Sequence, residues 1–104
     1  MEILDEVKLA LRITHTKLDE DLKAKMNAAK KDLISLGVDE TKVNSDADPL
    51  IVEAIKTYMQ YKYTRDDKEM ENYYNSWVVQ VDKLRKTAGY GYAVEESSEE
   101  GSDV

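Results

Sequence analysis

Apolar side chains recur at intervals of three and four along residues 49–84, and this spacing dictates helices. Such intervals place side chains on one face at 3.6 residues per turn, whereas a half-buried strand alternates at every second residue. Asp48 and Pro49 predict the start of the first of these helices, because aspartate favours the N-cap and proline the first helical position. We expect this helix to end near Tyr63. Its apolar stripe comprises Ile51, Ala54, Ile55 and Tyr58.

A second aromatic helix is predicted directly after it. Asp66 and Glu69 have the spacing of a capping box, and Gly89 predicts the helix end. Its apolar positions are Met70, Tyr73, Tyr74, Trp77, Val81 and Leu84.

The N-terminal part of the chain predicts two further helices. A short helix carries Leu4, Val7, Ala10 and Leu11 and is expected to end near Arg12. The next is predicted to begin with Thr16 as its capping residue and to end at Gly37, which suits a left-handed backbone. Its stripe comprises Leu22, Met26, Ala29, Leu33 and Leu36.

These elements predict an all-α fold, a compact bundle of four helices in one domain, residues 1–88. A polar loop, residues 37–48, is expected between the second and third helices, and residues 89–104 are expected to form a flexible, disordered acidic tail. The predicted core is Leu4, Val7, Leu11, Leu22, Met26, Leu33, Ile51, Ile55, Tyr58, Tyr74, Trp77 and Val81.

Composition narrows the class of protein. The chain has 104 residues, no cysteine and a net charge of −7, and its last twelve residues hold five of the 22 acids and no basic residue. Without cysteine there is no disulfide framework, thiolate nucleophile or cysteine-ligated zinc site. No secretion signal and no long apolar run is evident, so we expect no membrane association.

Enzymatic function is not predicted. His15 is the only histidine and is expected in an exposed turn. The acidic pairs Asp19/Asp21 and Asp66/Asp67 could in principle bind a metal, but both fall where helix N-termini favour acids. There is no glycine-rich phosphate loop or nucleophile elbow. We therefore expect no catalytic residues, no cofactor and no metal.

Residues 72–81, NYYNSWVVQV, are more apolar than one buried face requires. Trp77, Val78 and Val79 are successive, so their side chains leave a helix about 100° apart and cannot all reach one core. Either a neighbouring molecule covers the remainder or Val79 is an ordinary exposed valine.

Together these features resemble the small head-tail connector proteins of tailed bacteriophages, over about residues 3–87. In the second helix, Ala28 and Ala29 match an alanine pair typical of that family. In the third, the proline-led pattern is matched by Pro49, Ile51, Ala54 and Ile55. Thr14, His15 and Thr16 depart from the acids that often join the first two helices of the family. The first segment matches the family pattern at Leu4, Asp5, Glu6, Val7, Lys8, Leu11, Arg12 and Ile13.

The resemblance implies a structural adaptor of the virion that assembles as a ring under the portal protein at the head-tail junction. It implies that DNA passes through the channel without sequence-specific binding, that the next connector or tail protein docks on the ring, and that the protein is in the host cytoplasm during assembly. A ring protomer needs two different side surfaces. Candidate interface residues are Tyr61, Tyr63, Tyr73 and Val79, and candidate portal-docking residues are Tyr90 and Tyr92.

Two alternatives stay open. Lys23, Lys25, Lys30 and Lys31 could make the second helix the basic face of a nucleic-acid-binding packaging or regulatory protein, although the isoelectric point near 4.7 opposes tight phosphate binding. The chain could also be an acidic regulatory protein that binds a host factor through its tail.

Overall fold

The computed structural model describes residues 3–45 and 48–87 and consists of helices, with no β-strand among these residues. The Tyr90 and Tyr92 prediction, the disordered tail and the stop at Gly89 lie outside the described residues. The helices are α1 (Ile3–Leu11), α2 (Asp19–Ser35), α3 (Glu40–Asn44), α4 (Pro49–Tyr63) and α5 (Asp67–Lys86).

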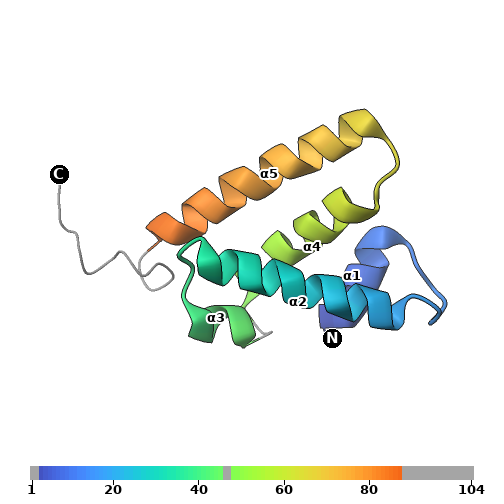
Figure 1. Ribbon diagram of the computed structural model, residues 1–104, viewed down its shortest axis with the longest axis horizontal. Helices are drawn as coiled ribbons and strands as arrows, with labels where there is room; N and C mark the ends of the chain where they lie inside the picture. Colours follow the sequence, from blue (N-terminus) through green and yellow to red (C-terminus); the bar gives the residue numbers. More distant parts are fainter. Residues whose placement is uncertain (1–2, 46–47, 88–104) are drawn as a thin grey trace.

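Helix α4 is the centre of the bundle. Helices α1, α2 and α5 all pack on it, and α5 runs beside it as its sequence neighbour and principal contact (Figure 1). The α1–α4 contact includes an ion pair of 3.6 Å between Glu6 and Lys56, and the pKa of Lys56 is raised, first by its hydrogen bond to Glu53. A second ion pair, of 2.8 Å, joins Lys8 of α1 to Asp19 at the start of α2.

The predicted ends of several helices are confirmed. The Asp48 carboxylate accepts from the backbone N–H groups of Leu50 and Ile51, at 3.0 and 3.4 Å. The Asp66 carboxylate accepts from those of Lys68 and Glu69, at 2.9 and 3.0 Å. Gly37 has φ +104°, the left-handed geometry that glycine adopts without strain.

One of the two hydrogen bonds of the predicted capping box is absent, the one from the backbone N–H of Asp66 to the Glu69 carboxylate. The Glu69 carboxylate accepts a hydrogen bond of 3.1 Å from the Thr64 hydroxyl, and the N–H of Asp66 donates to that same hydroxyl oxygen at 3.3 Å. Thr64 thus stands between the two capping residues and joins the end of α4 to the start of α5.

The polar loop predicted at residues 37–48 is wrong in part, because it contains a helix, and the described residues hold five helices rather than four. Asp39 caps α3 by accepting from the N–H of Lys42 at 3.2 Å. Val38 and Val43 are fully buried. One helical turn is too short to show a 3.6-residue period, and its stability comes from these two valines rather than from propensity.

The predicted Thr16 cap is also wrong. Helix α2 begins at Asp19, the flanking residue Leu18 makes no side-chain cap, and Thr16 contributes only its carbonyl, which accepts from the N–H of Asp19 at 3.2 Å. Acidic residues in the first turn, including Glu20 and Asp21, favour this helix end through the dipole instead.

The core matches the predicted set at nine of its twelve positions. Leu4 and Leu11 are only partly buried and pack against the core from its edge. Tyr74 is a clear error, because 47% of its surface is exposed. Helix α5 packs mainly on α4, so a narrower stripe of α5 is buried than helical periodicity suggested. That stripe consists of Trp77, Val81 and Leu84.

Candidate assembly surfaces

An apolar surface lies where α5 meets the end of α2. Val78, Val79 and Tyr74 are 46%, 57% and 47% exposed, and Leu36 at the end of α2 is 44% exposed. The ring of Tyr61 on α4 lies 5.3 Å from that of Tyr74, centroid to centroid. We call these five residues, Leu36, Tyr61, Tyr74, Val78 and Val79, the valine surface.

Two depressions make the valine surface uneven. One, of about 410 Å³, is lined by Leu36, Trp77, Val78 and Val79, among others. The other, of about 330 Å³, is lined by Tyr58, Tyr61 and Tyr74 and also by Asp32 and Lys62. Because single exposed apolar residues are common but a contiguous group is not, this arrangement is typical of an interaction surface.

Aromatic packing fixes the tyrosines of this surface. Trp77 lies 5.0 Å from the ring of Tyr58 in an edge-on arrangement, and Lys62 Nζ lies 5.5 Å and 5.3 Å from the ring centroids of Tyr58 and Tyr61. Burial, followed by the nearby negative charge of Asp32, raises the pKa of Tyr58. These contacts hold the rings of α4 in place, so the surface is preformed in the single chain.

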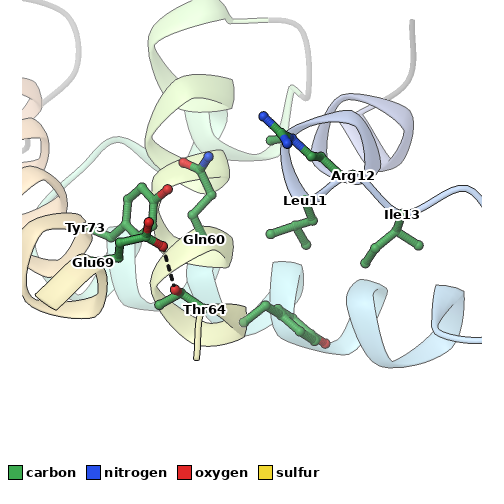
Figure 2. Close-up of a pocket in the computed structure, with 9 residues that line it drawn as sticks. Leu11, Arg12, Ile13, Gln60, Thr64, Glu69 and Tyr73 are labelled. Atoms are coloured by element: carbon green, nitrogen blue, oxygen red, sulfur yellow. Dashed lines mark hydrogen bonds between the residues drawn. The ribbon is translucent and has the colours of Figure 1, made fainter. Parts of the chain in front are cut away.

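A second cleft lies between the ends of three helices and has a volume of about 310 Å³. Figure 2 shows Leu11, Arg12 and Ile13 from the end of α1 facing Gln60 and Thr64 of α4, with Glu69 and Tyr73 of α5 beyond them. We call it the Arg12 cleft. Its lining residues are Ala10, Leu11, Arg12, Ile13, Gln60, Tyr63, Thr64, Glu69 and Tyr73.

Arg12 enters this cleft from an unusual backbone conformation. It has φ +59°, the only positive value at a non-glycine residue in the described chain. Its N–H donates to the carbonyl of Leu9 at 3.1 Å, and the N–H of Ile13 donates to that of Lys8 at 2.9 Å, which closes α1. Arg12 occupies the left-handed position after a helix end that glycine usually fills, and its backbone turns the chain toward α2.

Tyr63 forms the wall of the cleft nearest α2. Its hydroxyl donates a hydrogen bond to the Asp21 carboxylate of α2, and Lys25 Nζ lies 5.7 Å from the centroid of its ring. Burial, and then this hydrogen bond, raises the pKa of Tyr63 to about 12, while the same bond is the first cause of a lowered pKa at Asp21.

The four predicted interface residues therefore divide into two groups. Tyr63 and Tyr73 line the Arg12 cleft, whereas Tyr61 and Val79 belong to the valine surface. Tyr73 and Tyr74 are successive on α5, about 100° apart, and lie on either side of the buried stripe. The two surfaces consequently lie on opposite sides of the α4–α5 contact. Arg12, Leu36 and Tyr74 were not assigned from the sequence to a surface for assembly. Of the three, only Arg12 had a sequence signal, which was its position at a predicted helix end.

The residues considered for catalysis or nucleic-acid binding have other partners. His15 Nδ1 accepts from the N–H of Lys17 at 3.2 Å in an exposed turn. Lys23 and Lys25, half of the basic side proposed for α2, pair with Glu20 and Asp21 at 3.8 and 3.1 Å. Across residues 3–45 and 48–87, no group of three acidic, histidine or cysteine residues could hold a metal ion. No helix within those ranges is long and apolar enough to span a membrane.

Comparison with known families gives a match over residues 3–81 to the model of a phage connector protein family. The chain belongs to the phage connector protein family. No curated protein and no solved structure matches this connector significantly. Family membership gives the connector a structural role at the head-tail region of a phage virion and agrees with the resemblance noted in its sequence.

Proposed function

We propose that this connector assembles as a ring under the portal protein, extends the DNA channel and provides a platform for the next connector or tail protein. The observation that carries the proposal is the presence of two unlike surfaces on opposite sides of the α4–α5 contact. Contacts around a cyclic ring are heterologous, so each protomer must offer two different surfaces. The valine surface and the Arg12 cleft meet that requirement within one small domain.

The composition of the valine surface supports a role in assembly. It holds tyrosines and aliphatic residues that a free chain leaves exposed, and interface cores are enriched in such aromatic residues. Burying it between protomers would remove apolar area from water at about 25 cal/mol per Å² before the costs of association.

The ring proposal is tested by imaging virions assembled with the connector by cryo-electron microscopy. A closed ring of the chain between portal and tail is expected. Virions that lack the chain, or that hold it elsewhere, would overturn the proposal.

A charged residue within the valine surface should prevent assembly without unfolding the chain. Val79→Glu is expected to abolish incorporation into virions while the melting temperature stays near that of the parent, because Val79 is already exposed. Asn27→Glu adds the same charge at an exposed position of α2 outside both surfaces and should assemble normally. Normal incorporation of the Val79 variant would remove the valine surface from the proposal.

Portal docking is proposed for residues 89–104, through Tyr90 and Tyr92. Two aromatic residues on either side of a glycine suit a role as binding anchors, and the acids that follow would repel DNA in the channel. Deletion of residues 89–104 should leave the melting temperature unchanged and abolish retention on portal particles. Retention equal to that of the full chain would exclude this docking role.

A further inference from the structure

A third depression lies between the last turns of α5 and the first turns of α4, and its volume is about 340 Å³. We call it the Leu50 hollow. Leu50 is 52% exposed, so the hollow leaves apolar surface open to solvent in the described part of the chain. Its lining residues are Leu50, Glu53, Gln80, Lys83, Leu84 and Thr87.

The charged groups at the hollow differ in their partners. Glu53 pairs with Lys56 at 3.0 Å, whereas Lys83 makes no ion pair among the described residues. Arg85, two positions further along α5, likewise has no ion partner within residues 3–45 and 48–87. An occupant that is apolar first and acidic beyond would therefore complement both the hollow and the cations beside it.

Gln80 adds a requirement for a hydrogen-bond donor. Its Oε1 is shielded from solvent and has no hydrogen-bond partner in the part of the chain that the structure describes, and such an unsatisfied acceptor costs free energy. Because Gln80 lines the hollow, a turn of its side chain would present this oxygen to an occupant. A tyrosine suits this place, since its ring is apolar and its hydroxyl donates.

The segment that follows α5 begins at this hollow. Thr87, the last residue before that segment, lines the hollow itself, and Tyr90 follows within about 10 Å of backbone. A side chain on so short a tether meets a nearby surface at an effective concentration on the order of millimolar, so even a weak contact forms. Acids follow from Glu95 onward, and residues 88–104 contain no basic residue.

We infer that the Leu50 hollow binds Tyr90 of the same chain, with the acids that follow it near Lys83 and Arg85. The contact is made within one chain and goes beyond the proposed function, because it needs neither a ring nor a portal. It holds one candidate docking residue against the body until a partner displaces it. A single tethered side chain adds little to the free energy of unfolding, so a local probe measures the contact better than a thermal melt does.

Disulfide trapping supplies the local probe, because the chain has no cysteine of its own. Glu53→Cys places a thiol in the hollow, and Gly91→Cys places one beside Tyr90; together they form the hollow pair. Leu36→Cys with Gly91→Cys is the control pair, since Leu36 lies with Arg85 in a depression of the valine surface that is also near the end of α5. In dilute solution the hollow pair should form its intramolecular disulfide about tenfold faster than the control pair.

Two substitutions test whether Tyr90 and the hollow cause the faster reaction. Tyr90→Ser and Leu50→Glu, each introduced into the hollow pair, should lower its rate about tenfold. Leu9→Glu makes the same change at a leucine that is 65% exposed on α1 and should leave the rate unchanged. Circular dichroism is expected to show that every variant is folded, because both leucines are exposed.

Equal rates for the hollow pair and the control pair would overturn the inference, as would a hollow-pair rate that Tyr90→Ser does not change. A disulfide-linked dimer in place of the intramolecular product would assign the hollow to a second copy and would overturn it as well. None of these measurements contains the portal. The proposed ring and docking role are therefore tested separately, by imaging of virions and by retention on portal particles.

Discussion

The phenol of Tyr63, at the last residue of α4, donates a hydrogen bond to the carboxylate of Asp21, in the first turn of α2. The two residues are 42 positions apart, and their contact ties the ends of two helices together beside the Arg12 cleft. The pKa of Tyr63 is raised and that of Asp21 is lowered. Both shifts show that the folded chain favours a protonated phenol and an ionised carboxylate.

This pair predicts a dependence of stability on alkaline pH. The pKa of Tyr63 is raised to about 12, so its contribution is complete below the unfolded-state value of about 10 and is lost as pH rises toward 12. Tyr63→Phe should be less stable than the parent at neutral pH, and the difference should narrow between about pH 10 and 12. Denaturant melts of both chains across this range measure it, and a constant difference would show that folding does not raise the pKa of Tyr63.

The same pair predicts a loss of stability in acid. The lowered pKa of Asp21 means that its contribution is present above the unfolded-state value of about 3.9 and disappears as pH falls through the folded value. Asp21→Asn should abolish this part of the acid response. Asp5→Asn, at an exposed residue of α1, is the matched control and should leave the acid limb of the melting curve unchanged.

Truncation of a central leucine should show where the core lies. Leu22→Ala removes a fully buried side chain and is expected to lower the free energy of unfolding by about 2–5 kcal/mol, through lost transfer energy and the cavity left behind. Leu9→Ala makes the same change at a residue that is 65% exposed and should cost under about 0.5 kcal/mol. Similar losses at the two sites in urea melts would contradict the burial described here.

The short helix α3 should be part of the cooperative fold. Val43→Ala deletes two buried methyl groups and is expected to cost roughly 1–3 kcal/mol. Val79→Ala makes the identical change on the exposed valine surface, where a change within about 0.5 kcal/mol is expected. If Val43→Ala were neutral, the segment around α3 would not contribute to folding.

The cap of α5 offers a comparison between neighbouring aspartates. Asp66→Ala removes a carboxylate that accepts from two backbone N–H groups and should cost about 1 kcal/mol. Asp67→Ala removes only an acid from the first turn, worth about 0.3–1 kcal/mol through the dipole. Thermal melts should therefore rank the Asp66 variant below the Asp67 variant.

Several helix ends that depend only on nearby residues were predicted correctly from the sequence. Asp48, Asp66 and Gly37 were identified from sequence because a cap or a left-handed residue depends on its own backbone and a few neighbours. Helix α3 has a capping aspartate of the same kind, Asp39, but its five residues are too few to show a helical period, so its segment was interpreted as a loop. Arg12 was placed near the end of α1, but its left-handed backbone belongs to a residue type that seldom adopts it.

The candidate surfaces required knowledge of how the helices are turned toward one another. Periodicity assigned Tyr74 to the core because it lies near Trp77 on the helix wheel. The contacts of α5 are mainly with α4, and only this packing shows that the side of α5 that carries Tyr74 is exposed. The same packing places Tyr73 and Tyr74 on different surfaces. The sequence pattern alone does not specify this separation.

The packing of α1 on α4 also has a consequence for the order of events during synthesis. Helix α1 leaves the ribosome well before α4, yet it packs mainly against that later helix, which begins only at Pro49. A nine-residue helix has little stability alone in water. Helix α1 therefore gains its main packing partner only after α4 has emerged, and the body closes late rather than growing outward from α1.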